Sequence, residues 1–319
     1  MTAQDLAQAV LRERDTFTEG LLYFLLELGD NCLEDLLAKR GTASTSCRST
    51  RAFFELGQGT DAPVVYCVNN CSLGHSHAST NGVGVRQVRR IADVADKYQV
   101  RMVKITGSQR IDLLGVNKSD LPKIWADLGM PSGQAYTKGV RMVKTCVGTD
   151  FCRFGTQDST SAGIELERRL ENLYTPHKVK MGAVGCPRNC AEATVKDIGL
   201  VGQEGSWQVV VGGAAGKTVR KADLLITVAG TDEALEAAEL FFQYYREHAN
   251  YLERTYDFVE RIGIEKVRKE TVYATDMSKQ GLLDRLRKSK ALAKDAWLER
   301  NEPRTATQFV QITPMEVFA

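Results

Sequence analysis

Two stretches, "KTCVGTDFC" at residues 144–152 and "VGCPRNC" at residues 184–190, hold four of the eight cysteines of this chain. Five residues separate Cys146 from Cys152, three separate Cys186 from Cys190, and 33 lie between the two pairs. Structural zinc sites usually pair ligands at two to four residues, so the first spacing is long for zinc and the second fits. Two loops that each supply two thiolates can also hold a [4Fe–4S] cluster. The spacing alone leaves a cluster, zinc and unligated thiols open.

Glycine and proline in these stretches favour tight loops around a metal group. Gly148, Gly155, Gly185 and Pro187 let the backbone turn closely and aim N–H groups at the cysteine sulfurs.

Composition narrows the class of protein. The 319 residues suggest two domains or one large one, and the 43% hydrophobic content is enough for a core. The formal charge of +2 gives no global field that would attract nucleic acid. The longest apolar run, "LLYFLL", is too short for a membrane span, and we expect neither a span nor a secretory signal. We therefore expect a cytoplasmic, soluble protein without nucleic-acid or membrane partners. In that compartment, cysteines are metal ligands or free thiols more often than disulfides.

Hydrophobic periodicity predicts an α+β chain. Residues 1–57 read as helical, with an unknown role. Residues 58–135 give a strand at "APVVYCV", a helix at "VRQVRRIADVADKY", strands at "VRMVKIT" and "RIDLLGV", and a helix at "KSDLPKIWADLG", an order typical of a ferredoxin-like half-domain. Residues 136–265 form a mixed α/β domain with the cysteine pairs, and residues 266–319 a charged tail. Within this domain, Thr231 is expected to cap a helix that ends near residue 249.

A possible nucleotide motif, "GGAAGKT" at residues 212–218, does not fit a phosphate loop. Three residues separate Gly212 from Gly216 where the loop needs four, and the segment lies between two predicted strands. We predict a glycine-rich hairpin. Because no G-x-G-x-x-G follows a strand, the chain has no evident site for NADH or flavin.

Longer motifs identify a family. "KTCVGTDFCRFGTQDST" and "TPHKVKMGAVGCPRNCAEATVKDIGLV" resemble the sirohaem and [4Fe–4S] segment of the nitrite and sulfite reductase family. The similarity runs from about Val85 to Gly263 and is strongest to the C-terminal part of the large subunit of assimilatory NAD(P)H-dependent nitrite reductases. It implies a ferredoxin-like half-domain followed by a sirohaem and [4Fe–4S] domain.

The resemblance also assigns roles to residues. It implies that Cys146, Cys152, Cys186 and Cys190 hold the cluster, and that Cys190 is also the axial ligand of the sirohaem iron. The K-x-K pair, Lys178 and Lys180, would bind the substrate anion and supply protons. Alternation along a strand places both lysines on one face, and sirohaem, rich in carboxylates, needs a basic pocket.

Further basic and polar residues are candidates for the same pocket. The resemblance places Thr106, Gln109 and Arg110 in a sirohaem-contacting turn and Arg141 at the substrate anion. Arg153 and Arg188 lie in the cysteine loops, where they either pair with haem carboxylates or cap the loops. His177 is either a proton relay or structural.

The expected function is the six-electron reduction of nitrite to ammonium by an oxidoreductase. The alternatives are reduction of sulfite to sulfide and a non-catalytic iron–sulfur electron-transfer subunit. Electrons would come from a flavin or NAD(P)H subunit or domain outside this chain. Because most relatives carry two copies of the unit and this chain one, we expect a homodimer or another domain to cover the cofactor. Cys67 and Cys71, with His75 and His77 nearby, are either a minor metal site or a loop with free thiols.

Overall fold

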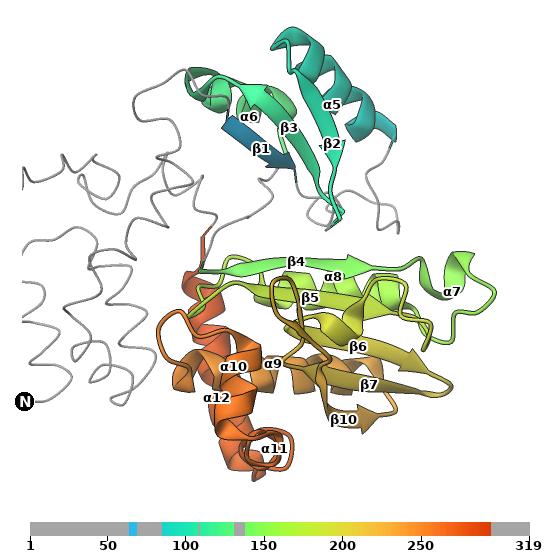
Figure 1. Cartoon of the computed structure of the whole chain (residues 1–319), viewed down its shortest axis with the longest axis vertical. Helices are drawn as coiled ribbons and strands as arrows, with labels where there is room; N and C mark the ends of the chain where they lie inside the picture. Colours follow the sequence, from blue (N-terminus) through green and yellow to red (C-terminus); the bar gives the residue numbers. More distant parts are fainter. Residues whose placement is uncertain (1–63, 69–84, 108, 131–137, 295–319) are drawn as a thin grey trace, which may run out of the picture.

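The structure is a computed structural model that describes residues 64–68, 85–107, 109–130 and 138–294. These residues form a small α/β unit that lies above a larger one in Figure 1. The predicted helical segment 1–57, the C-x3-C loop beyond Val68 and the end of the predicted tail lie outside the described residues.

The small unit is a three-stranded antiparallel sheet covered by two helices. Its elements are β1 (Val64–Val68), α5 (Val85–Lys97), β2 (Met102–Ile105), β3 (Ile111–Val116), the short 3-10 turn η2 (Lys118–Asp120) and α6 (Leu121–Leu128). The strand order is β1-β3-β2, and the predicted succession of strands and helices is confirmed. Ile91 and Val94 of α5 pack with Leu113 of β3 and Ile124 of α6, because helical spacing puts these apolar residues on one face.

The larger unit contains a five-stranded mixed sheet with the order β10-β7-β6-β5-β4. Its strands are β4 (Val140–Thr145), β5 (Val179–Val184), β6 (Ile198–Gln203), β7 (Ser206–Val211) and β10 (Asp223–Val228). β4, β5 and β6 are parallel, and β7 and β10 run antiparallel to their neighbours. Parallel strands need a crossover, and α8 (Ser159–Leu170) supplies it between β4 and β5.

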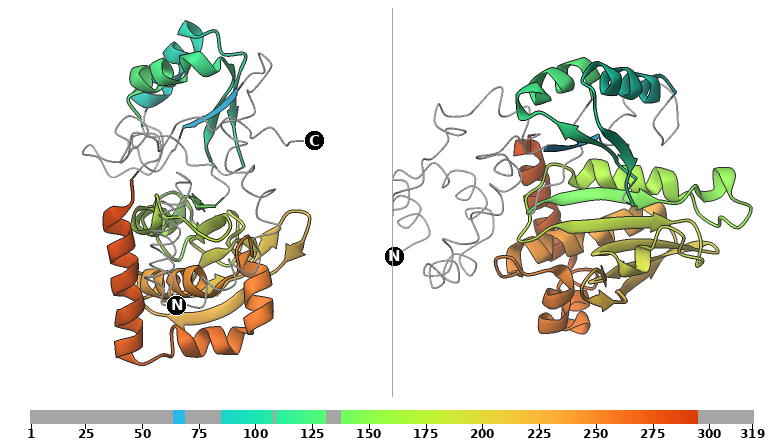
Figure 2. Two further views of the ribbon diagram at one scale, coloured as in Figure 1. Left: turned by 90° about the vertical axis from the view of Figure 1, so that its left-hand side faces the viewer. Right: turned by 45° about the horizontal axis from the view of Figure 1, so that its top comes forward.

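Helices cover one face of this sheet. α8 and α9 (Thr231–His248) pack against the strands, with α10 (Thr255–Ile262) and α11 (Ile264–Glu270) at one end, as the two views of Figure 2 show. The core between helices and sheet holds the fully buried Trp207, Phe241, Tyr245 and Phe258. The opposite face of the sheet is left for the candidate site.

Two details correct or extend the sequence prediction. The N-cap of α9 is Gly230, whose N–H donates to Glu233 Oε2 at 3.1 Å, and not Thr231. Thr231 Oγ1 instead accepts from Trp207 Nε1 at 3.1 Å, so its hydroxyl is used in packing the sheet against the helix.

The first half of the predicted charged tail is packed against the larger unit. α12 (Asp276–Leu292) lies along α9, and its Leu282 and Leu283 contact Leu240 of that helix. The division into segments 1–57, 58–135, 136–265 and 266–319 stays a prediction.

The glycine-rich segment forms the predicted hairpin. Two short antiparallel strands, β8 (Ala214–Ala215) and β9 (Val219–Arg220), pair across its turn. No helix begins there, which agrees with the exclusion of a phosphate loop.

Candidate functional site

The two cysteine pairs lie in loops that leave the ends of neighbouring parallel strands. Cys146 follows β4 and Cys186 follows β5, so the sheet brings the start of each loop to one edge. Cys146 N–H donates to the backbone oxygen of Ala183 at 3.2 Å, and Gly185 N–H donates to Cys146 Sγ at 3.2 Å. The second loop therefore places a backbone donor on a sulfur of the first.

Glycine allows the two loops to touch backbone to backbone. A Cβ on Gly185 would lie 2.5 Å from the backbone oxygen of Gln157, and one on Gly155 would lie 2.7 Å from that of Gly148. Gly148 itself has φ +62°, a conformation that L side chains rarely adopt. The loops are held by hydrogen bonds from Thr156 N and Gln157 N to Gly185 O, at 2.7 and 3.0 Å.

The four cysteine side chains differ in their exposure. Cys186 is buried, Cys146 and Cys152 are half-buried, and Cys190 is exposed. Among the described residues, no three His, Cys, Asp or Glu side chains are gathered closely enough for a metal ion. The N–H donor on Cys146 Sγ is the kind of contact that tunes cluster sulfurs. Four thiols on two touching loops are the donor set of a [4Fe–4S] cluster, although the four sulfurs are not gathered at one point in this structure.

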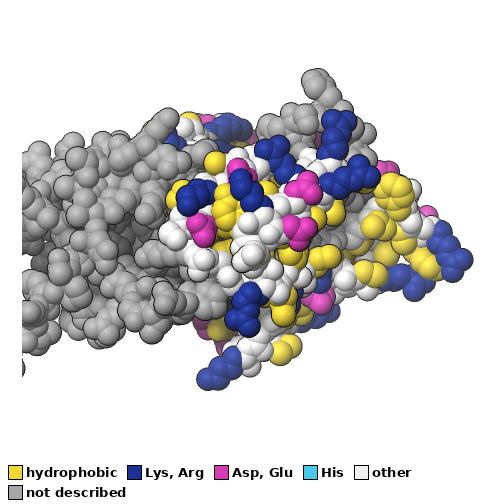
Figure 3. All heavy atoms as spheres, turned by 90° about the horizontal axis from the view of Figure 1, so that it is seen from above, with side chains coloured by type: hydrophobic (Ala, Val, Ile, Leu, Met, Phe, Trp, Pro, Cys, Tyr) yellow, Lys and Arg dark blue, Asp and Glu magenta, His cyan; other side chains and the backbone are white. Residues whose placement is uncertain are grey.

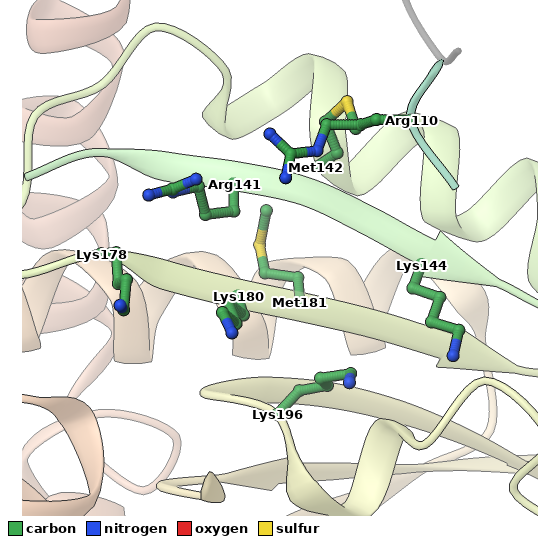
Figure 4. A pocket seen from close by; sticks show the side chains of 8 residues that line it. All are labelled: Arg110, Arg141, Met142, Lys144, Lys178, Lys180, Met181 and Lys196. Atoms are coloured by element: carbon green, nitrogen blue, oxygen red, sulfur yellow. The ribbon is translucent and has the colours of Figure 1, made fainter. Parts of the chain in front are cut away.

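A basic cavity of about 190 Å³ opens on the sheet face opposite the helices (Figure 4). Its charged lining consists of cations only: Arg110, Arg141, Lys144, Lys178, Lys180 and Lys196. Met142 and Met181 complete the wall. Such a surplus of positive charge is suited to an anion.

A bulge in β4 places two of these cations together. Val140 and Val143 are three residues apart, yet both face the core cluster, because the register with β5 shifts between them. Arg141 and Lys144 therefore both line the cavity, whereas regular alternation would put them on opposite faces of the sheet.

The K-x-K pair lies in the cavity wall on one side of β5, as predicted from alternation (Figure 4). Burial lowers the pKa of both ammonium groups, and the nearby charge of Arg254 lowers it further. Each therefore gives up a proton more readily than a solvated lysine.

A buried carboxylate holds the strand that carries Lys180. Asp197 is 1% exposed and accepts the Lys180 backbone N–H at 2.7 Å and Arg254 Nη2 at 3.0 Å to each of its oxygens. It also accepts the hydroxyl of Thr255. Asp197 thus joins β5, the start of β6 and the start of α10.

Glu192 links the cavity to the second cysteine loop. Its carboxylate lies 3.3 Å from Lys144 Nζ and 3.0 Å from Lys196 Nζ, two of the lining cations. Because Glu192 is two residues beyond Cys190, the loop and the cavity wall are neighbours.

His177 is next to the cavity and is neutral at neutral pH. Its Nδ1 accepts the Lys178 N–H at 2.8 Å, and burial together with the charge of Arg254 lowers its pKa to about 4. This geometry favours the structural interpretation of His177 over the proton relay.

The predicted turn at residues 106–110 contributes one side chain to the cavity and two to its support. Arg110 lines the cavity. Thr106 Oγ1 accepts the Arg110 N–H at 3.1 Å, which closes the turn. The Gln109 side chain pairs with the backbone of Thr145, donating at 2.7 Å and accepting at 3.0 Å, and so ties the small unit to the first cysteine loop.

Arg153 and Arg188 lie elsewhere. Their guanidinium carbons are 4.6 and 3.9 Å from the ring centre of Phe154, so one arginine from each cysteine loop stacks on the same ring. Neither lines the basic cavity. Figure 3 shows hydrophobic side chains beside lysines and arginines at the end of the molecule that carries α7 (Gly148–Phe151).

Sequence reasoning missed Lys144, Lys196, Glu192 and Asp197. All four stand in the motifs quoted for the family resemblance, but no spacing or periodicity there marks them as site residues. Lys196 and Glu192 reach the site through the 3-10 turn η3 (Ala193–Val195), which has no sequence periodicity to reveal it.

The two cysteine loops beside a basic cavity point to a redox protein that binds an anion. Comparison with known proteins identifies its family. Residues 136–280 match the nitrite and sulphite reductase 4Fe-4S domain, and residues 80–130 match the nitrite/sulfite reductase ferredoxin-like half domain. The chain belongs to the nitrite and sulfite reductase family.

Three relatives show where in the family the similarity lies. The chain is 54% identical over 66% of its length to a nitrite reductase [NAD(P)H] of Bacillus subtilis, and 39% identical over 71% to the nitrite reductase (NADH) large subunit of Escherichia coli. It spans 26% and 27% of those two proteins. It is also 38% identical over 56% of its length to the assimilatory-type sulfite reductase of Nitratidesulfovibrio vulgaris, of which it covers 82%.

Solved structures share the fold. The Mycobacterium tuberculosis NirA protein aligns with 70% of this chain and 40% of its own, with a TM-score of 0.51 at 16% identity. Dissimilatory sulfite reductase I aligns with 81% of this chain and 73% of its own, with a TM-score of 0.53 at 15% identity. The predicted α+β fold with a ferredoxin-like half-domain is confirmed. Within the described residues, no helix is long and apolar enough to cross a membrane.

Proposed function

We propose that this chain is the sirohaem and [4Fe–4S] part of an oxidoreductase that reduces nitrite to ammonium. The observation that carries the proposal is the all-cationic cavity joined to the second cysteine loop through Glu192. Anion binding and electron supply would then lie side by side, as a multi-electron reduction of an anion requires.

The cofactors would be held by the residues that the family resemblance assigns. Cys146, Cys152, Cys186 and Cys190 would ligate the cluster, and Cys190, exposed on its loop, is accessible to a second group, the sirohaem iron. Arg110, with Thr106 and Gln109 behind it, would pair with a carboxylate of the macrocycle. When bound, sirohaem supplies the iron at which nitrite is reduced, with six electrons delivered one at a time.

The chain's own cations would bind the substrate anion and deliver protons. Arg141 keeps its positive charge throughout and would fix the anion. Lys178 and Lys180, with lowered pKa values, would give protons to the departing oxygens and regain them from solvent. Asp197 limits the lowering, because its negative charge raises both pKa values and keeps the lysines charged enough to bind an anion.

Arg153 and Arg188 have a different place in this proposal. Stacked on Phe154 at the outside of the two cysteine loops, they would hold the loops together, in agreement with the capping alternative. A cation–π contact at an exposed site stabilises by about 0.5–1 kcal/mol, so the pair is a modest clamp.

Electrons would come from a flavin or NAD(P)H subunit or domain outside this chain, since none of its motifs is typical of a dinucleotide site. A homodimer would be one way to cover the cofactor. Cytoplasmic location stays an expectation from the sequence.

The lysine pair gives the direct test. Lys178→Ala and Lys180→Ala should each lower viologen-driven nitrite turnover by roughly 10²-fold with cofactor content unchanged, because each removes electrostatic and general-acid help. Lys221→Ala, a matched control on an exposed lysine outside the cavity, should keep full activity. If both cavity variants keep the wild-type rate, Lys178 and Lys180 are solvated surface lysines without a role in turnover.

Sulfite reduction to sulfide is the second candidate. It is favoured by the similarity to the sulfite reductase of Nitratidesulfovibrio vulgaris, of which the chain covers 82%. Comparing kcat/KM for nitrite and sulfite in one preparation separates the two. Turnover of neither anion by the cofactor-loaded protein would leave the non-catalytic electron-transfer alternative.

A further inference from the structure

The glycine-rich hairpin of residues 212–218 forms a wall of a second cavity, next to the one in which the reaction is proposed. This cavity measures about 320 Å³ and shares Lys178, Lys180 and Lys196 with the first. Its other polar lining includes Lys217, Thr218, Asp197, Arg254 and Tyr256. The two cavities are thus neighbours along one line of lysines.

The hairpin is fixed in place by its glycines. Gly212 N–H donates to the backbone oxygen of Asp197 at 3.0 Å, and Gly213 N–H donates to that of Lys196 at 2.9 Å. A Cβ on Gly213 would lie 2.5 Å from that same Lys196 oxygen, so only glycine permits this approach. Backbone pairing therefore determines where the hairpin presents Lys217 and Thr218.

The lining carries an excess of positive charge. Five cations, Lys178, Lys180, Lys196, Lys217 and Arg254, face one carboxylate, Asp197.

Two of these cations are not fully neutralised by the described residues. Arg254 uses Nη2 on Asp197, while its buried Nε has no hydrogen-bond partner among the described residues. Lys217 is exposed and lines the cavity, and no ion pair of Lys217 is found among the described residues. An anion with several oxygens could accept hydrogen bonds from these side chains and neutralise their positive charge.

We propose that this second cavity is an oxyanion site, with Lys217, Lys196 and Arg254 as its ligands, and that a free anion held there passes along Lys180 to the first cavity. The delivery role rests on the proposed function, whereas the binding of an oxyanion does not. The ligand chemistry, an oxygen-bearing anion, has two sources: a free inorganic oxyanion or a carboxylate arm of the cofactor.

The test uses inorganic phosphate, an oxyanion that is not reduced, titrated calorimetrically into the cofactor-loaded protein at low ionic strength. Lys217→Gln should weaken phosphate binding by about fivefold, the size expected for removing one charge about 4 Å from an anion in a water-like medium. Lys221→Gln changes the same charge four residues further along the chain, outside the cavity, and should leave the affinity unchanged.

The outcomes separate the sources. Phosphate binding that Lys217→Gln alone weakens supports a free oxyanion. No phosphate binding, with faster cofactor loss from Lys217→Gln than from Lys221→Gln, supports a cofactor carboxylate in the cavity. Equal behaviour of the two variants in both measurements overturns the site. Because phosphate binding is read without turnover, its failure and a failure of nitrite reduction are distinguishable.

Discussion

Replacing Asp197 by asparagine is expected to destabilise the larger unit by about 2–3 kcal/mol. The change removes a buried charge that accepts from Lys180 N, from Arg254 and from Thr255. Breaking a buried ion pair typically costs about 3–5 kcal/mol, because the remaining charge is left uncompensated. Here the Arg254 side chain stays 18% exposed, and partial solvation reduces that cost.

The assay is thermal unfolding followed by circular dichroism. A loss of about 2–3 kcal/mol corresponds to a fall in Tm of about 5–10 °C for a unit of this size. The matched control is Asp223→Asn, whose partner Arg220 lies at 2.6 Å but whose own side chain is 34% exposed. That variant should lose at most about 1 kcal/mol. If the two variants have the same Tm, the reasoning about Asp197 is wrong.

The same variant has a second, independent readout in the pH profile. The negative charge of Asp197 raises the pKa of Lys178 and of Lys180. Without it both pKa values fall, so the alkaline loss of turnover should begin at lower pH in Asp197→Asn. If Asp197 were only structural, Asp197→Asn would lower turnover without shifting the alkaline side of the pH profile.

Two further predictions concern the neighbours of the cavity and the cysteine loops. His177, with a folded pKa of about 4 against an ordinary 6.5, should stay neutral in an NMR titration down to about pH 5. Because the unfolded chain binds this proton first, stability should fall as the pH drops from 6.5 towards 4, and less so in His177→Asn; a measured pKa near 6.5 contradicts this. Gly185→Ala forces a Cβ to 2.5 Å from Gln157 O and should cost about 1–3 kcal/mol and lower iron incorporation. Gly107→Ala, with open space around its Cβ, should do neither, and equal iron content in both would refute the close-approach argument.

The sequence predicted the elements that depend on short-range pattern. Apolar residues at helical spacing, such as Ile91 and Val94, located α5, and the run "RIDLLGV" located β3 within a residue. The K-x-K pair could be placed on one face because β5 is regular at that point.

Residues brought in by irregular backbone could not be predicted in this way. Lys144 joins Arg141 only because β4 bulges between Val140 and Val143, and a bulge breaks the alternation used to assign faces. Asp197 reads as an ordinary acid at a strand start, and its burial follows from α10 returning to place Arg254 opposite it. The N-cap of α9 is Gly230 and not the predicted Thr231, because the Thr231 hydroxyl accepts a hydrogen bond from Trp207, which is distant in sequence.

The visible absorption spectrum of the purified, cofactor-loaded chain, recorded beside that of Cys190→Ser, tests the central claim most directly. We expect Soret and red bands of sirohaem together with cluster absorption in the wild type. We also expect loss of the coupled cofactor signal when an oxygen replaces the exposed sulfur, because an alkoxide is a poor ligand for soft iron centres. A spectrum with no tetrapyrrole bands, or a Cys190→Ser variant that keeps both cofactors and full turnover, would contradict it.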